Sequence, residues 1–124
     1  MKRILVVILF SIISVNAFAV NDLGKATYQM ACSNCHAVNY SKVMGSPAVH
    51  DKKAWKQRFK NAQREANSNP QKYKTSLDYL LHSVVNGKKL MHHGGLCHES
   101  NVPKKNCSNE ALVAAIQYMS QADN

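Results

Sequence analysis

The segment MACSNCHAV, Met30 to Val38, places two cysteines and a histidine within five positions, from Cys32 to His36. This CxxCH spacing restricts the chain more than any other feature, because few kinds of site use it. In covalent haem attachment, the two thiols form thioethers with the haem vinyl groups and the following imidazole is the proximal iron ligand. We therefore predict one haem c, bound through Cys32 and Cys35, with His36 as a metal ligand.

The same residues would also be compatible with three alternatives. A thioredoxin-like redox dithiol should open a helix after a strand in an alternating α/β pattern, and the sequence lacks that pattern. A zinc site would combine the pair with Cys97, Cys107 or a histidine, but an oxidising compartment favours disulfides over free thiolates. A chance CxxCH in an ordinary globular domain is the third alternative.

The first nineteen residues have the layout of an export signal. A basic start precedes an apolar run, Ile4 to Val15, which ends near the possible cleavage site Ala17-Phe18-Ala19. A membrane helix needs about 20 apolar residues, so a retained anchor is the less favoured alternative. We expect a signal peptide over residues 1–19, one domain over residues 20–124, and a periplasmic location.

The charge balance bears on partners. Loss of the signal would remove two of the 16 basic residues and leave 7 acidic ones, for a net charge of about +7. Such a surface favours redox partners with acidic docking surfaces or association with an anionic membrane, although a solvated lysine-rich surface without a partner would look the same. Nucleic acid is not expected, because no groove-reading motif or interleaving of aromatic and basic residues is seen.

Apolar residues recur at helical rather than strand spacing along the rest of the chain. The fold class predicted is all-α: a small single domain of about four helices around one covalently bound haem. A domain of this size has a modest core, so we expect a poorly folded protein without haem. Helices are expected over residues 22–31, 51–66, 75–86 and 108–121, with loops over 40–50, 67–74 and 87–107.

The loop before the last helix, GKKLMHHGGLCHESNVPKKNC, should supply the sixth iron ligand. Met91 is the favoured residue, since a flexible Gly-Gly pair follows it and a soft thioether suits an electron-transfer haem. His92 and His93 are its rivals, and a vacant position is the remaining alternative. Met44 follows the CxxCH motif too closely to cross the ring easily and is expected to pack.

These features together resemble the class I c-type cytochromes, and within them the cytochrome c5-like family, which implies the small single-domain cytochrome c fold. The resemblance covers nearly all of the mature chain, through GKATYQMACSNCHA, the loop from Gly45 to Pro47, Trp55 with Arg58, NGKKLMHHGG and NEALVAAIQYM. The sequence departs from the family in two places: His92 and His93 stand where a proline usually follows the methionine, and nine residues separate Cys97 from Cys107.

The resemblance implies roles for residues outside the CxxCH motif. The carbonyl of Pro47 would accept a hydrogen bond from the proximal imidazole, which fixes its orientation. Trp55 and Arg58 would lie near the haem propionates, as an indole donor and a guanidinium. Cys97 and Cys107 would form a disulfide that restrains the loop carrying Met91.

The implied activity is single-electron transfer between respiratory redox proteins, without chemical change of a substrate. The protein would then be an electron carrier and not an enzyme, with its exposed haem edge as the electron port. The alternative is a haem enzyme or gas-binding module whose distal site is vacant or held by His92 or His93. Rapid binding of carbon monoxide to the reduced protein would favour that alternative.

Overall fold

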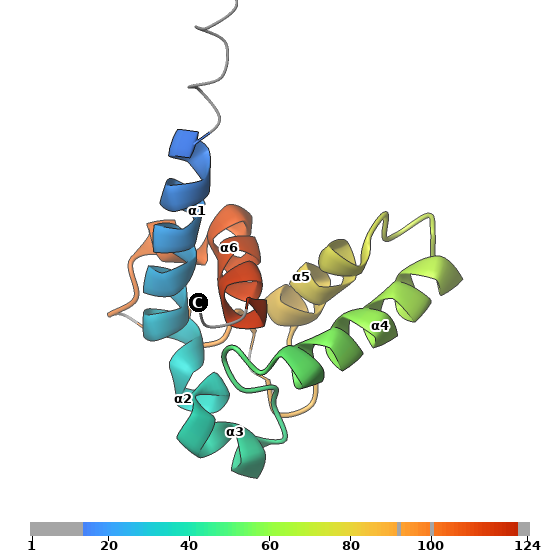
Figure 1. The fold of residues 1–124 in the computed structure, drawn as a ribbon, viewed down its shortest axis with the longest axis horizontal. Coiled ribbons are helices and arrows are strands. Elements are labelled where there is room, and N and C mark those ends of the chain that lie inside the picture. The colour runs from blue at the N-terminus through green and yellow to red at the C-terminus, as the bar shows by residue number, and fades with distance from the viewer. Residues whose placement is uncertain (1–13, 92, 100, 122–124) are drawn as a thin grey trace, which may run out of the picture.

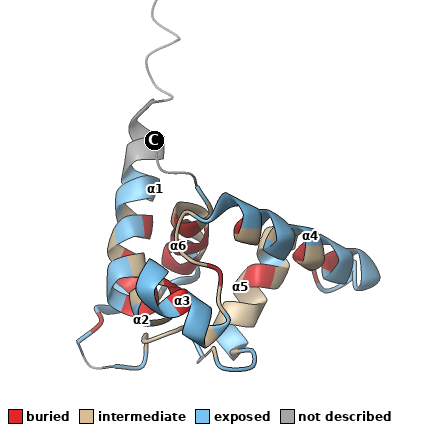
Figure 2. Cartoon of the chain, turned by 60° about the horizontal axis from the view of Figure 1, so that its bottom comes forward, coloured by how far each residue is buried: buried red, intermediate tan, exposed pale blue. Residues whose placement is uncertain are grey.

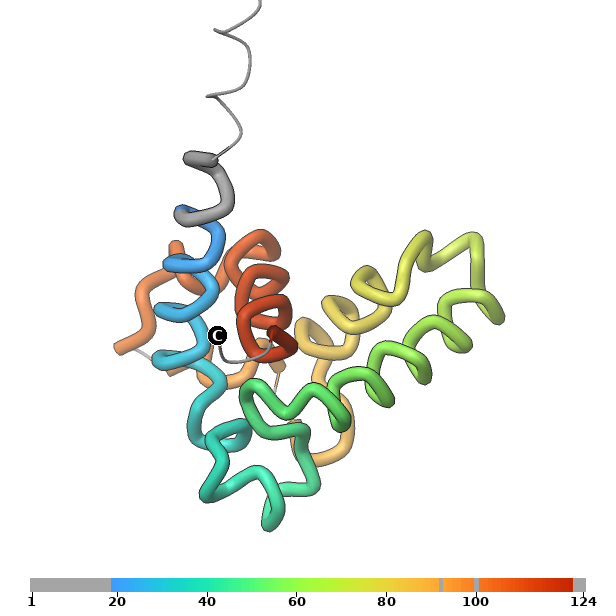
Figure 3. Tube along the Cα trace, in the orientation of Figure 1, coloured from blue at the N-terminus to red at the C-terminus, as the bar shows by residue number. Residues whose placement is uncertain are grey.

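Two pairs of helices enclose the interior of the protein. The computed structural model describes residues 14–91, 93–99 and 101–121. The first and last helices, α1 and α6, lie side by side, and α4 and α5 form the second pair (Figure 1). Short helices α2 and α3 follow α1 and connect the two pairs, as the tube in Figure 3 traces. The helices are α1 (Ser14–Thr27), α2 (Ser33–His36), α3 (Val38–Met44), α4 (Lys52–Ser68), α5 (Ser76–Asn86) and α6 (Asn109–Ser120), with a π-helical turn at Tyr28–Cys32 and a 3₁₀ turn at Lys104–Cys107.

Side-chain caps fix the starts of the three later long helices. The Asp51 carboxylate accepts a hydrogen bond from the Ala54 amide at 2.9 Å, and the Ser108 hydroxyl group accepts one from Ala111 at 3.1 Å. At α5, Thr75 and Asp78 form a reciprocal capping box. These contacts satisfy amides that have no partner within the helix, so α4, α5 and α6 begin close to where the sequence predicts.

Two elements differ from the expectation. Residues 40–50 were expected to form a loop, but α3 covers the first part of that range and ends at Gly45, whose φ is +63°. The helix has little apolar periodicity because most of its surface faces solvent (Figure 2). The first helix was expected to begin at Asp22, but α1 begins at Ser14, so Asp22 lies within it.

The core is built around α6, which contacts α1, α4, α5 and the π-helical turn. At the α1–α6 contact, a Cβ atom built on Gly24 would lie 2.3 Å from the carbonyl oxygen of Ala114, so only glycine allows this approach. No helix within the described ranges is both long and apolar enough to cross a membrane. The buried core cluster consists of Ala31, Cys32, Trp55, Ala62, Leu80, Val102, Ala115, Ile116 and Met119.

Candidate functional site

The CxxCH segment begins in the π-helical turn and continues into α2. Cys32 is buried and Cys35 is half-buried, and both carry free thiols. Burial raises the pKa of the Cys32 thiol to about 12, and the neighbouring Cys35 adds to the shift. A redox dithiol needs an attacking thiolate near neutral pH, and the buried Cys32 thiol is poorly suited to that part.

His36 is buried, with its imidazole fixed in orientation. Its Nδ1 lies 2.8 Å from the carbonyl oxygen of Pro47, which is the contact that the family resemblance implies. Burial lowers the pKa of His36, while the Pro47 bond opposes this effect and the Arg58 charge adds to it. A neutral imidazole that donates through Nδ1 to a carbonyl keeps the lone pair of Nε2 for a metal.

Trp55 packs beside this imidazole. Its ring is nearly parallel to that of His36, with centroids 6.0 Å apart and an angle of 24° between the planes. The indole Nε1 donates to the carbonyl oxygen of Ala48 at 2.8 Å. The indole proton is therefore engaged with the backbone here, and the placement of Trp55 near a haem propionate stays a prediction.

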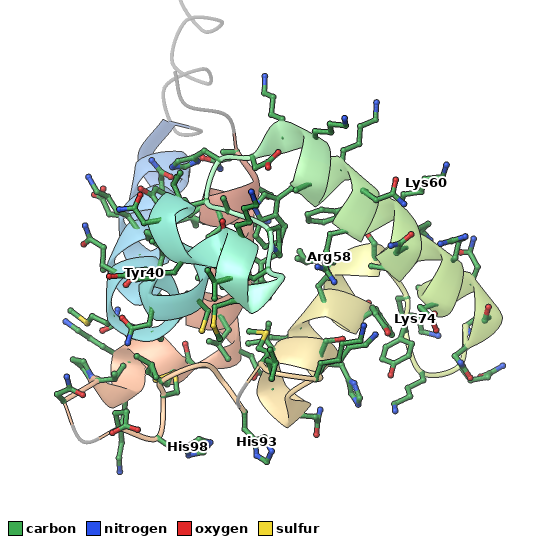
Figure 4. All side chains as sticks on the ribbon, turned by 90° about the horizontal axis from the view of Figure 1, so that it is seen from below. Tyr40, Arg58, Lys60, Lys74, His93 and His98 are labelled. Atoms are coloured by element: carbon green, nitrogen blue, oxygen red, sulfur yellow. A yellow bond between two sulfur atoms is a disulfide. The ribbon has the colours of Figure 1, made fainter. Side chains whose placement is uncertain are left out.

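A cavity of about 610 Å³ opens beside His36 and Trp55. Its volume falls within the usual range for a cofactor or ligand site, roughly 300–1,000 Å³. Every predicted site residue except Cys32 lines it; Cys32 lies in the adjoining core. Arg58 points from α4 toward the space between α3 and α5 (Figure 4). The lining includes Cys35, His36, Pro47, Trp55, Arg58 and Met91, together with apolar residues Leu80, Val84, Ile116 and Met119.

Met91 reaches this cavity from the loop after α5. The loop is attached to the fold beyond Met91, because the Gly94 amide donates to the Val84 carbonyl at 2.7 Å and the Leu96 amide to the Ala31 carbonyl at 3.0 Å. Between these two bonds, Gly95 approaches the backbone of Ala31 so closely that a Cβ atom would lie 2.3 Å from its carbonyl oxygen. The loop therefore runs directly against the CxxCH segment.

The rival ligand candidates have different positions. His93 is exposed and lies against His98, with ring centroids 6.2 Å apart, at the outer edge of the loop and away from Arg58 (Figure 4). His92 lies outside the described residues. Met44 lines the same cavity as Met91, so its sequence position alone was a weak argument against it.

Cys97 and Cys107 form a disulfide, with their Cα atoms 5.6 Å apart. The bond ties the loop that carries Met91 to the 3₁₀ turn before α6. Thiols engaged in a disulfide are not zinc ligands, so the zinc alternative loses two of its proposed partners.

Several lining residues were not predicted from the sequence. Asn61 and Arg64 follow Arg58 at helical spacing on α4, so the periodicity of that helix could have indicated them. Tyr79 likewise lies one turn before Ser83 on α5, whereas Lys88 had no such signal, because its position depends on how the loop folds back onto α5.

Comparison with known proteins agrees with this geometry. Residues 19–119 match the family described as "Cytochrome C oxidase, cbb3-type, subunit III", which is most of the chain. The chain belongs to this family of c-type cytochromes. It is also 46% identical over 49 residues to "Cytochrome c-555" of Chlorobaculum tepidum. That match covers 39% of this chain and 43% of the relative, so the chain spans less than half the length of this curated protein. No solved structure shows a significant match.

Membership of a c-type cytochrome family identifies the cofactor as haem c, bound covalently, and a chain of this size fits one such group. The residues present also fit haem: two free thiols at CxxC spacing, a buried imidazole with one nitrogen already bonded, and an apolar cavity with cationic residues at its edge. The all-α class I cytochrome fold predicted from the sequence is confirmed. The cytochrome c5-like subfamily remains a prediction.

Proposed function

We propose that the protein carries single electrons between redox proteins, with haem c attached through Cys32 and Cys35 and ligated by His36 and Met91. Bound haem iron takes up and releases one electron. The observation that carries the proposal is that His36, with its Nδ1 bonded to Pro47, shares one cavity with Met91 and Cys35. Two iron ligands supplied by the protein would favour electron transfer over binding of an external ligand.

The protein's own residues would keep the site rigid and dry. The Pro47 carbonyl holds the imidazole in one orientation, and Trp55 packs against its ring. Apolar residues of α5 and α6 line part of the cavity wall, where they would shield a bound haem from water. Arg58 supplies a positive charge that would offset the haem carboxylates. Little motion is needed when one electron moves, because both ligands would stay in place.

Spectroscopy of the purified holoprotein tests this assignment. A pyridine assay should report haem joined by two thioethers, and the ferric protein should show the weak red band of a methionine–iron bond. Met91→Ala should abolish that band and allow carbon monoxide to bind the reduced protein. Met44→Leu and His93→Gln are the matched controls and should leave the band unchanged. A colourless product with the mass of the bare polypeptide would overturn the proposal.

We also propose that the protein acts in the periplasm and docks on redox partners with acidic surfaces. The family match begins at residue 19, where the predicted signal peptide ends, and supports this location. Exposed apolar and cationic residues lie at the cavity or next in sequence to a residue that lines it: Leu90 is 66% exposed and lines the cavity with Lys89, and Val43, which is 84% exposed, follows Lys42 and precedes the lining residue Met44. Such a surface suits a partner with an apolar patch and surrounding carboxylates.

Small redox reagents of opposite charge test the steering by charge. Reduction by an anionic reagent, ferrocyanide, should be fastest at low ionic strength and slow as salt is added. Reaction with the cationic reagent hexaammineruthenium should show the opposite trend. Lys42→Glu should weaken the salt dependence with ferrocyanide. A ferrocyanide rate that does not change with ionic strength would contradict the steering but not the carrier role.

A further inference from the structure

The turn that carries Met91 is closed by its own backbone. The Lys88 amide donates to the Met91 carbonyl at 3.1 Å, and the Met91 amide donates to the Lys88 carbonyl at 3.0 Å. This reciprocal pair means that the backbone of Met91 moves with that of Lys88. Whatever holds Lys88 therefore also holds Met91.

The side chain of Lys88 joins this turn to helix α5. Its Nζ donates to the phenolic oxygen of Tyr79 and lies 5.0 Å from the centroid of the same ring. Tyr79 in turn packs edge-on against the buried ring of Tyr73, with centroids 5.2 Å apart. Lys88 and Tyr79 both line the cavity. The lysine thus connects the Met91 turn to an aromatic group packed within the α4–α5 pair.

The remaining attachments of this loop follow Met91 in the chain. The amides of Gly94 and Leu96 bond to the carbonyls of Val84 and Ala31. These bonds fix the loop on the C-terminal side of Met91. On the N-terminal side, the described side-chain contact that joins the turn to a helix is the one between Lys88 and Tyr79.

We propose that Lys88 and Tyr79 are a positioning pair that holds Met91 at the cavity and so controls how readily an external ligand displaces it. The inference rests on the proposed role of Met91 as axial ligand. A turn released from Tyr79 opens more often, and each opening exposes the cavity to competing ligands while the rest of the fold is intact. Neither residue touches the iron in this scheme; both act through the position of Met91.

Imidazole binding to the ferric holoprotein measures this control directly. Tyr79→Phe removes the oxygen that accepts the bond, and Lys88→Gln removes both the charge and the bond. Each change should raise the affinity for imidazole roughly fivefold, the scale of one partly exposed charged hydrogen bond. Because the two residues act through one contact, the double variant should bind imidazole no more tightly than Lys88→Gln alone.

Lys72→Gln is the matched control, because Lys72 lies over the neighbouring Tyr73 ring at 5.2 Å and carries the same charge. It should leave imidazole affinity unchanged.

Urea unfolding of every variant separates local opening of the turn from loss of global stability. The proposal is overturned if Tyr79→Phe and Lys88→Gln bind imidazole as the wild type does, or if their effect equals that of Lys72→Gln. Met91→Ala tests the role of Met91 as a ligand separately. If this variant keeps the red band, Met91 is not the ligand, and that result says nothing against the contact between Lys88 and Tyr79.

Discussion

Trp55 makes two contacts near the proximal ligand that phenylalanine reproduces only in part. Its ring packs beside His36, and its Nε1 donates to the Ala48 carbonyl at 2.8 Å. Trp55→Phe keeps an aromatic ring but leaves the carbonyl without its donor and removes buried volume, at a cost of about 2 kcal/mol in the free energy of unfolding. Urea denaturation of the holoprotein measures this loss.

Phe59→Leu is the control for Trp55→Phe, because Phe59 packs against the core from the same helix and has no polar atom to lose. It should cost less than Trp55→Phe. Equal stability of Trp55→Phe and the wild type would show that the bond to Ala48 adds nothing to the folded state.

At single residues, the family resemblance predicted a contact that the spacing of residues alone did not. The bond between His36 and the Pro47 carbonyl was implied by matching motifs, and the structure contains it. The partner of the Trp55 indole was not foreseen, because a proton donor in a sequence does not reveal which acceptor the fold offers. The Lys88–Tyr79 contact was missed for a similar reason: nine positions separate the two residues, and their meeting depends on the turn after α5.

The close approach of α1 and α6 depends on a glycine, Gly24. At Gly24 a Cβ atom would lie 2.3 Å from the Ala114 carbonyl oxygen and 3.0 Å from the Cβ atom of Tyr118. Backbone cannot yield as a flexible side chain can, so Gly24→Ala should force the helices apart and destabilise the protein by roughly 2–3 kcal/mol, despite the better helix propensity of alanine.

Thermal unfolding followed by circular dichroism measures the effect of Gly24→Ala. Asn21→Ala is the matched change, because Asn21 is exposed on the same helix and its replacement meets no backbone. The second variant should be neutral or slightly more stable. If both variants unfold at the same temperature, the close approach of α1 and α6 does not limit stability.

Helices α4, α5 and α6 were predictable because each buries one face and carries its own capping residue. Asp51, Thr75 and Ser108 stand at helix starts both in the pattern and in the structure. Helix α3 was not predicted, since Val38 and Val43 are exposed and the helix has no buried stripe to give a period. Its exposed apolar residues suit the proposed docking surface. A sequence pattern that identifies helices by a buried apolar face does not detect them.

The molecule as a whole combines a small core with a large cavity that is partly open to solvent. The four long helices among the described residues bury mostly small or medium side chains around a space of about 610 Å³. Without a bound cofactor, the apolar side chains that line so large a space lack packing contacts. The remaining contacts between helices then offset little of the conformational entropy that the chain loses on folding. The covalent group is therefore expected to complete the core as well as to carry the electron.

Cys32→Ser combined with Cys35→Ser tests this role of haem in folding, because it removes both points of attachment. We expect the apoprotein to lose much of its helicity in far-ultraviolet circular dichroism and to unfold without a cooperative transition. Cys97→Ser with Cys107→Ser also removes two cysteines but leaves the attachment site; it should keep haem and lose about 3 kcal/mol of stability, the value expected for a loop of this length. Near-native helicity and cooperative unfolding of the first variant would mean that the four-helix frame is stable around an empty cavity.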